Sequence, residues 1–173
     1  MQGNLEFSYG IMRPAQAGRM TSNLNYSQIT DALFIGRTPH ARDYGILRDM
    51  GVDLVINMRI WPRPRPDSLD PPMRILWLRT FDSPLLPIPI GALEKGARQA
   101  LAVMQGGGKI YTHCQFGRHR GAAMGAAILI AQGHTADEAM ALIKEKRPNA
   151  DPYIWYIRSR IRKFAERWNP SPR

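Results

Sequence analysis

The sequence of 173 residues contains one cysteine, no long apolar run and fewer acidic than basic side chains. One cysteine excludes an internal disulfide framework and a zinc site built from several cysteines. A free thiol is best tolerated in a reducing compartment. The longest apolar run, residues 122–131, is far shorter than the roughly twenty residues that span a membrane, and it indicates a buried helix. With no apolar block of a secretory signal at the N-terminus, we expect a cytoplasmic protein without a membrane span.

Acidic residues are the second shortage, since 24 Lys and Arg face 14 Asp and Glu and leave a net charge of +10. Such an excess favours an anionic partner, namely a phosphorylated substrate, nucleic acid or acidic lipid. A solvated basic surface is the plain alternative. No nucleic-acid-binding motif is present, so a nucleic-acid binder without catalysis is not favoured. Four arginines near the C-terminus lie off an apolar helical stripe and are expected on the surface: Arg158, Arg160, Arg162 and Arg167.

The chain predicts one domain over residues 26–169, preceded by an N-terminal arm over residues 1–25. Short apolar runs alternate with longer segments of helical spacing, which is typical of a parallel sheet covered by helices. We therefore expect an α/β fold, a three-layer sandwich with a central, mainly parallel sheet of four to five strands. The predicted strands are 32–36, 52–58, 73–79 and 110–112, and the predicted helices lie within 38–51, 91–108, 121–132, 135–147 and 152–168.

Local signals mark several boundaries of these elements. Thr38 is expected as a helix N-cap, with Pro39 at the first helical position. Thr135 and Glu138 form a capping box at the start of a later helix. Residues 61–72 are rich in proline and charge and are expected to form a surface loop.

The single cysteine, Cys114, lies where a predicted strand gives way to a helix. The strand ends at His113 and the helix begins near Gly121, so the N–H groups of the intervening loop and the positive end of the helix surround one point. That point suits a phosphate-sized anion, and Arg120 beside it favours the thiolate. Gly117 allows successive amides of the loop to turn inward. The alternative is that Cys114 is only a small buried hydrophobe near basic residues.

These residue types fit phosphoryl transfer. The thiolate can attack phosphorus in line to give a phosphocysteine, while the planar fork of Arg120 matches two phosphate oxygens. The leaving oxygen needs a proton, and Asp82 follows a predicted strand whose carboxyl end reaches the same edge of the sheet. We expect Asp82 to act first as the acid and later as the base that activates water. The alternative is that Asp82 caps the turn at Ser83–Pro84.

Residues 113–120, HCQFGRHR, have the form H-C-x-x-G-x-x-R and resemble the active-site motif of the cysteine-dependent protein tyrosine phosphatase superfamily. The chain length and the separation of Asp82 from Cys114 are similar to those of its dual-specificity branch. The resemblance extends from about residue 26 to residue 168. It includes the LFIG strand, the FDSPLLPI segment and the helices that follow the loop.

The resemblance implies a role for each matching position. Cys114 would be the nucleophile, Asp82 the general acid and base, and His113 a support for the thiolate; a hydrogen-bonded core histidine is the alternative for His113. His119 is expected to anchor the loop, as in the similar G-K-H-R loops of phosphatases related to those acting on inositol pyrophosphates. The resemblance implies no cofactor or metal. The expected phosphate-binding residues are Gln115, Phe116, Gly117, Arg118, His119 and Arg120.

One position departs from the family pattern. The family usually has Ser or Thr after the motif arginine, and this chain has Gly121. In the family that hydroxyl stabilises the departing thiolate, so its absence should leave attack intact and slow hydrolysis of the intermediate. Thr112 or Ser83 could supply the hydroxyl instead.

Three functions remain open at this point. The first is a phosphatase acting on phosphotyrosine or phosphoserine/threonine in proteins. The second is the same chemistry on an inositol phosphate, a phosphoinositide or an RNA 5′ end, which Arg118, the arginines of residues 61–72 and the net charge favour. The third is a non-catalytic phosphate-binding module, suggested only by Gly121. In all three cases the expected partner is a phosphorylated protein or another anionic phosphate.

Overall fold

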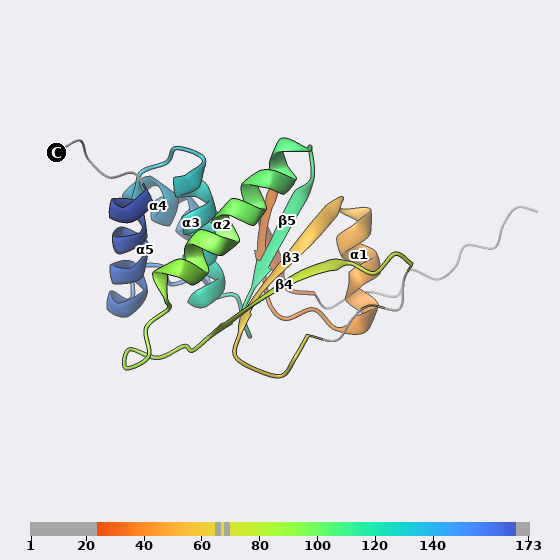
Figure 1. The fold of residues 1–173 in the computed structure, drawn as a ribbon, viewed down its shortest axis with the longest axis horizontal. Helices are drawn as coiled ribbons and strands as arrows, with labels where there is room; N and C mark the ends of the chain where they lie inside the picture. The colour runs from red at the N-terminus through yellow and green to blue at the C-terminus, as the bar shows by residue number, and fades with distance from the viewer. Residues whose placement is uncertain (1–23, 65–66, 68–69, 169–173) are drawn as a thin grey trace, which may run out of the picture.

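The computed structural model describes residues 24–64, 67 and 70–168. Nearly all of the predicted N-terminal arm, residues 1–23, therefore lies outside the described residues. Within them five strands form one sheet, and five α-helices and a short 3-10 turn surround it (Figure 1). The strands are β1 (Tyr26–Thr30), β2 (Leu33–Gly36), β3 (Val52–Arg59), β4 (Arg74–Thr80) and β5 (Lys109–His113). The helices are α1 (Tyr44–Asp49), α2 (Ile90–Gln105), α3 (Arg120–Ala131), α4 (Ala136–Lys146) and α5 (Trp155–Trp168).

The strand order in the sheet is β1-β2-β5-β3-β4. β2, β5, β3 and β4 run parallel, and β1 pairs antiparallel with β2 at the edge. In Figure 1, α1 covers one face of the sheet and the other helices lie on the opposite face. The expected α/β fold with a central, mainly parallel sheet is confirmed. The sequence did not predict the antiparallel β1, because its five residues contain a single aliphatic side chain, Ile29.

The two faces of the sheet pack into two apolar clusters. The larger one surrounds α3, whose residues Arg120 to Ile130 are all buried, so the prediction of a central helix is confirmed. The smaller one lies under α1 and includes Leu47, Val55 and Tyr111. Because Cys114 belongs to the larger cluster, the thiol lies on the side of the sheet covered by α3.

The helix predicted after Thr38 begins later, and the assignment of Thr38 as its N-cap is wrong. The backbone is still extended at His40, then forms a 3-10 turn over Ala41–Asp43 before α1. The Thr38 hydroxyl donates instead to the Cys114 carbonyl at 2.9 Å. A part-buried carbonyl needs a donor, and this long-range bond satisfies it. By contrast, the capping box of Thr135 and Glu138 is present as predicted.

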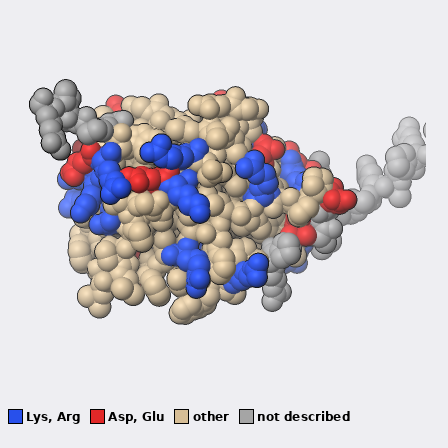
Figure 2. Space-filling view, in the orientation of Figure 1, with Lys and Arg blue, Asp and Glu red and all other residues tan. Residues whose placement is uncertain are grey.

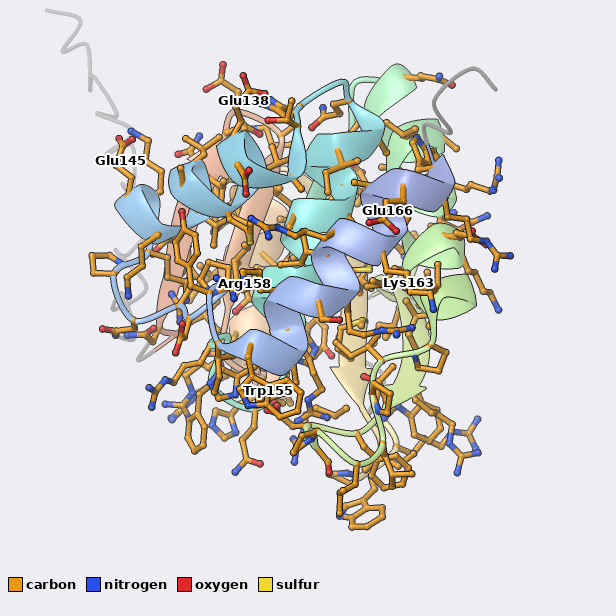
Figure 3. All side chains as sticks on the ribbon, turned by 90° about the vertical axis from the view of Figure 1, so that its left-hand side faces the viewer. Glu138, Glu145, Trp155, Arg158, Lys163 and Glu166 are labelled. Carbon is orange, nitrogen blue, oxygen red and sulfur yellow. The ribbon has the colours of Figure 1, made fainter. Side chains whose placement is uncertain are left out.

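On the face seen in Figure 2, Lys and Arg form several separate groups among mostly uncharged residues. Arg158, labelled on α5 in Figure 3, is exposed, as are Arg162 and Arg167. Their predicted surface location is confirmed, whereas Arg160 is half-buried and donates to the Ile88 carbonyl at 2.8 Å. Among the described residues, no helix is both long enough and apolar enough to cross a membrane.

Candidate active site

The four parallel strands end at one edge of the sheet, the lower edge in Figure 1. β5 leads into residues 114–119, called here the Cys114 loop, and β4 leads into residues 81–89, called the Asp82 loop. Within the sheet, His113 at the end of β5 pairs with Gly36 of β2 and Asn57 of β3. Parallel strands therefore bring the two predicted catalytic segments to one place, as expected for loops at carboxyl ends.

The first carbonyls of the Cys114 loop are bonded to groups outside the loop. The Cys114 carbonyl accepts from the Thr38 hydroxyl at 2.9 Å and from Nδ1 of His113 at 3.0 Å. The Gln115 carbonyl accepts from the backbone N–H of Thr38 at 3.3 Å. The segment after β2 thus holds the start of the loop.

The next three carbonyls are held from the opposite side of the loop. Arg147 donates to the carbonyls of Phe116 and Gly117 at 3.0 and 3.1 Å. The backbone N–H of Asp151 donates to the Arg118 carbonyl at 2.9 Å. The segment between α4 and α5 therefore fixes the second half of the loop.

This pattern determines where the amides of the loop point. In a trans peptide the N–H lies opposite to the C=O of the same unit. Because the carbonyls of residues 114–118 point outward, the N–H groups of residues 115–119 turn inward. The loop then enters the N-terminus of α3, whose partial positive charge adds to the same point. Inward amides beside a helix N-terminus are an arrangement that can bind an anion.

Gly117 is the residue that permits this course of the chain. Its φ is +67°, in the left-handed region that side chains disfavour. A Cβ at this position would also collide with the carbonyl group of Gly36. The motif glycine therefore serves both the turn of the loop and its close approach to β2.

Arg147 is a residue of the site that the sequence analysis did not identify. It is 3% exposed, and besides the two loop carbonyls it donates to Asn25 Oδ1 at 2.8 Å and Ser27 Oγ at 3.3 Å. Burial lowers its pKa from the usual arginine value. Within the described residues no acidic side chain forms an ion pair with it. Its charge is satisfied by oxygen dipoles, and a lone arginine after a helix gives no sequence signal of this role.

Arg120 is anchored by the ends of two neighbouring strands. One guanidinium nitrogen, Nη1, donates to the carbonyls of Met58 and Thr80 at 3.1 and 2.8 Å. Its Nε lies 3.5 Å from Oδ2 of Asp82 and is buried without a hydrogen bond to the described residues. The guanidinium is thus fixed at the edge that holds the Cys114 loop.

Asp82 contacts the Cys114 side of the site, as predicted. Its carboxylate lies 3.2 Å from Nδ1 of His119 and accepts from the Tyr156 hydroxyl at 2.9 Å. The turn that follows is capped differently, because the N–H of Leu85 donates to Ser83 Oγ at 3.2 Å. The Asp82 carboxylate thus lies against His119 and Tyr156, while Ser83 caps the turn.

Tyr156, in the first turn of α5, is the second residue missed from the sequence. Its hydroxyl also lies 3.1 Å from Nδ1 of His119, and the two rings meet edge to face at 5.9 Å. Burial and the Asp82 carboxylate raise the pKa of Tyr156 to about 12. The phenol therefore stays protonated and donates to Asp82. The sequence pattern assigned this helix only its apolar stripe, and Tyr156 lies beside that stripe.

His113 is buried and neutral. Burial lowers its pKa to about 4, with Arg59 and Arg120 contributing in the same direction and the bond to Cys114 opposing it. Since the Cys114 carbonyl can only accept, Nδ1 of the neutral ring carries the proton. His113 thus supports the start of the Cys114 loop through a neutral hydrogen bond.

Gly121 lies directly against the end of β5. A Cβ at this position would lie 3.3 Å from the Cys114 nitrogen and 3.4 Å from the His113 Cα, so a side chain here would point at the backbone of Cys114. Of the two replacement hydroxyls, Ser83 accepts a hydrogen bond within its own turn. Thr112 Oγ1 is buried without a partner among the described residues, which makes it the better candidate.

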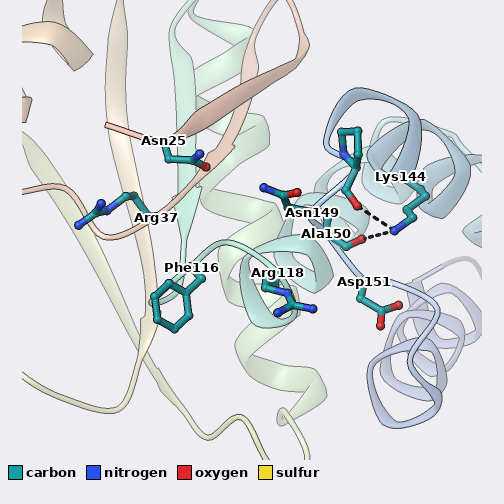
Figure 4. Close-up of a pocket in the computed structure, with 9 residues that line it drawn as sticks. Asn25, Arg37, Phe116, Arg118, Lys144, Asn149, Ala150 and Asp151 are labelled. Carbon is teal, nitrogen blue, oxygen red and sulfur yellow. Dashed lines mark hydrogen bonds between the residues drawn. The ribbon is translucent and has the colours of Figure 1, made fainter. Parts of the chain in front are cut away.

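A cleft of about 780 Å³ opens on the outer side of the Cys114 loop (Figure 4). Phe116 and Arg118 project into it from the loop, and Asp151 and Lys144 line its other side. Lys144 Nζ donates hydrogen bonds to the carbonyls of Pro148 and Ala150 at 2.9 and 3.0 Å. Phe116 and Arg118, whose backbone amides were the predicted phosphate ligands, therefore line this cleft with their side chains, while Gln115 is exposed. Among the described residues, no group of three or more His, Cys, Asp or Glu could hold a metal ion.

No family model matches this chain. It is 30% identical over 132 residues to dual specificity phosphatase 28 of Mus musculus, an alignment that covers 76% of this chain and 78% of that protein. The human dual specificity phosphatase 28 is 28% identical over 160 residues, with 90% and 88% covered.

Solved structures agree with these relatives. A crystal structure of human DUSP28 superposes with a TM-score of 0.71 at 26% identity, covering 82% of this chain and 93% of that one. A crystal structure of a mouse dual specificity phosphatase complexed with zinc tungstate gives 0.71 at 27% identity, with 92% and 94% covered. The fold, the position of the motif at residues 113–120 and these relatives agree. The chain therefore belongs to the dual specificity phosphatases of the cysteine-dependent protein tyrosine phosphatase superfamily, and it is a cysteine-dependent phosphatase.

Proposed function

We propose that this chain hydrolyses phosphate monoesters, phosphotyrosine and/or phosphoserine/threonine in proteins, through a phosphocysteine intermediate on Cys114. One observation carries the proposal: the carbonyls of residues 114–118 are bonded outward, so the loop offers its amides to a phosphate next to the buried thiol. Membership of the dual specificity phosphatases supports the substrate class. The non-catalytic alternative is disfavoured because the thiol, Arg120 and Asp82 meet at one edge.

In the first step the Cys114 sulfur attacks phosphorus, and the S–P bond forms as the bond to the leaving oxygen breaks. The inward amides and the Arg120 guanidinium stabilise the charge on the equatorial oxygens. Asp82, as the carboxylic acid, gives its proton to the leaving oxygen. Tyr156 and His119 position the carboxyl group for this transfer.

In the second step water replaces the sulfur. The Asp82 carboxylate takes a proton from water as the water oxygen attacks phosphorus, and the S–P bond breaks. Inorganic phosphate leaves and the thiolate is restored. The Thr112 hydroxyl is our candidate for stabilising that thiolate, because Gly121 has no side chain to do so.

The test compares the wild type, Cys114→Ser and Asp82→Asn on an aryl phosphate and on an alkyl phosphate. Cys114→Ser should lose all hydrolysis of both. Asp82→Asn should lose about 10² to 10⁴ of kcat on the alkyl ester and less on the aryl ester, whose leaving group needs less protonation. Mass spectrometry of acid-quenched wild type should find one phosphoryl group on Cys114.

Asp137→Asn is the matched control, since Asp137 is an exposed acid paired with Arg162 on the surface. It should leave both rates unchanged. Hydrolysis that survives Cys114→Ser would refute the mechanism.

A non-protein phosphate is the second candidate substrate. It is favoured by arginines at the same edge, including Arg59, whose Nη1 donates to the Thr38 hydroxyl at 3.2 Å. Burial and the nearby Arg120 lower the pKa of Arg59, as expected for two cations directed at one site. Relative kcat/KM values on a panel of phosphopeptides, inositol phosphates, phosphoinositides and 5′-phosphorylated RNA decide between the two classes.

A further inference from the structure

Exposed aromatic side chains gather around the candidate active site. Trp61 follows β3 and Phe81 follows β4, so both lie at the carboxyl edge of the sheet. They are 67% and 40% exposed, and their rings meet edge to face at 6.5 Å. Trp155, labelled at the start of α5 in Figure 3, is 65% exposed and packs against Tyr156 of the site. Such side chains at one edge form a rim around the catalytic loops.

The Asp82 loop adds two leucines to this rim. Leu85 and Leu86 are 87% and 53% exposed, in the loop between β4 and α2 that projects at the lower left of Figure 1. Residues 83–93 contain no charged side chain, and prolines flank the two leucines. Neither leucine lines the cleft beside the Cys114 loop. Both side chains are exposed, so they are suited to insert into an apolar environment and do not line a ligand cavity.

Every parallel strand also places an arginine at or near its carboxyl end. Arg37 follows β2, Arg59 ends β3, Arg79 lies near the end of β4 and Arg118 follows β5; Arg63 lies just beyond β3. Among the described residues no acidic side chain forms an ion pair with any of them. The lower margin of the molecule in Figure 2 is accordingly formed mainly by uncharged and basic atoms.

Two acidic side chains near this edge are already engaged. Asp82 accepts from Tyr156 and contacts His119 and Arg120. Asp151 accepts from the backbone N–H of Ile154 at 3.0 Å. Their charges are therefore directed within the protein, and the outer part of the rim remains basic and apolar.

We propose that this rim is a membrane-docking surface that places the active site against an anionic lipid bilayer. Trp and Leu side chains enter the boundary between headgroups and acyl chains, and flanking arginines bind acidic headgroups. A soluble polyphosphate would use the arginines but not the leucines. A peptide ligand would occupy a groove, whereas the two leucines do not line the cleft beside the Cys114 loop. The surface goes beyond the proposed function, and its binding does not require turnover.

The experiment is flotation of the full chain with vesicles of phosphatidylcholine alone or mixed with phosphatidylserine. Cys114→Ser is used as the parent, so that failure of the phosphatase mechanism cannot change the result. The parent should float with the mixed vesicles, and its Trp fluorescence should shift to shorter wavelength on binding. Adding Leu85→Ser with Leu86→Ser should weaken binding about tenfold. In the wild-type background the same pair should leave hydrolysis of a soluble aryl phosphate unchanged.

Charge is tested with two matched pairs of neutralised residues. Arg63→Gln with Arg79→Gln removes two rim charges and should weaken binding about thirtyfold, since each basic residue near an anionic surface contributes about 1 kcal/mol. Arg74→Gln with Lys109→Gln removes two charges at the opposite ends of β4 and β5 and should bind as the parent does.

Three outcomes would overturn the proposal. One is no flotation of the parent with mixed vesicles. Another is an equal loss of vesicle binding in the two double charge variants, which would indicate that binding depends on net charge and not on this rim. The third is self-association of the chain that the leucine pair abolishes, without vesicle binding, which would assign the rim to a second copy.

Discussion

The Cys114 loop and the Asp82 loop leave the same edge of the sheet, and they are held in different ways. The Cys114 loop is fixed through its backbone, by Thr38 on one side and Arg147 on the other. The Asp82 loop is fixed mainly by side-chain bonds of Asp82 itself and by Arg160 at Ile88. The Cys114 loop is therefore held rigidly through its backbone, whereas the position of Asp82 depends on a few exposed side-chain contacts.

Substitution of Arg147 should disrupt the Cys114 loop more than any other change considered below. Arg147→Met leaves the carbonyls of Phe116 and Gly117 without donors in a buried place, which should cost about 3 kcal/mol of unfolding free energy. Activity should fall by about a hundredfold as the amides lose their orientation. Urea unfolding and aryl phosphate kinetics check both effects. Arg162→Met, at a surface ion pair, should change stability by less than about 0.5 kcal/mol; equal effects of the two changes would contradict the assigned role.

A second prediction concerns pH and the start of the Cys114 loop. The folded pKa of His113 is about 4, against 6.5 for a free histidine. As the pH falls, His113 binds a proton at a higher pH in the unfolded chain than in the folded one. The free energy of unfolding is therefore highest above pH 6.5 and decreases as the pH drops toward 4. The loss amounts to as much as about 3 kcal/mol. His113→Asn keeps a donor for the Cys114 carbonyl and should flatten the dependence of unfolding free energy on pH in this window. An unchanged slope would show that other groups cause it.

Removing the Tyr156 hydroxyl tests how far the Asp82 loop depends on a single side-chain hydrogen bond. Tyr156→Phe deletes the bond to Asp82 and keeps the ring against His119. The kcat on an alkyl phosphate should fall about tenfold, and on an aryl phosphate by less than about threefold, because only a poor leaving group depends on a well-positioned acid. Tyr153→Phe is the matched control on a nearby exposed tyrosine. An equal loss on both esters would indicate a purely structural role for Tyr156.

The smallest expected effect tests the junction of the Cys114 loop with α3. Gly121→Ser restores the hydroxyl of the family pattern and should raise the steady-state rate by a few-fold, on the order of 1 kcal/mol of barrier, without changing substrate affinity. The added Cβ meets backbone at 3.3 Å, so a small shift of α3 accompanies it. Thr112→Val should lower the rate of phosphoenzyme breakdown if the Thr112 hydroxyl takes the place of the one missing at Gly121. Single-turnover kinetics separate breakdown from attack, and an unchanged or slower breakdown in Gly121→Ser would contradict the prediction.

Much of this organisation could be predicted from the sequence because the signals are local. The apolar runs that form β3 and β5, the capping box of α4 and the motif from His113 to Arg120 depend on spacing within a few residues. Thr38 shows the limit of such signals. Its position before Pro39 resembles a helix cap, but a carbonyl 76 residues away binds its hydroxyl instead.

The sequence alone predicted the parallel α/β order, and its motif and spacing marked the Cys114 loop and Asp82 as candidates. The side chains that hold these two segments became visible only in the folded chain. Tyr156 lies 74 residues from Asp82 and Arg147 lies 30 from Gly117, so no local period connects these pairs. The physical reason is that buried carbonyls and carboxylates must find donors wherever the packed chain brings one. Packing of α4 and α5 against the sheet supplies those donors, and it does so through contacts that sequence spacing does not encode.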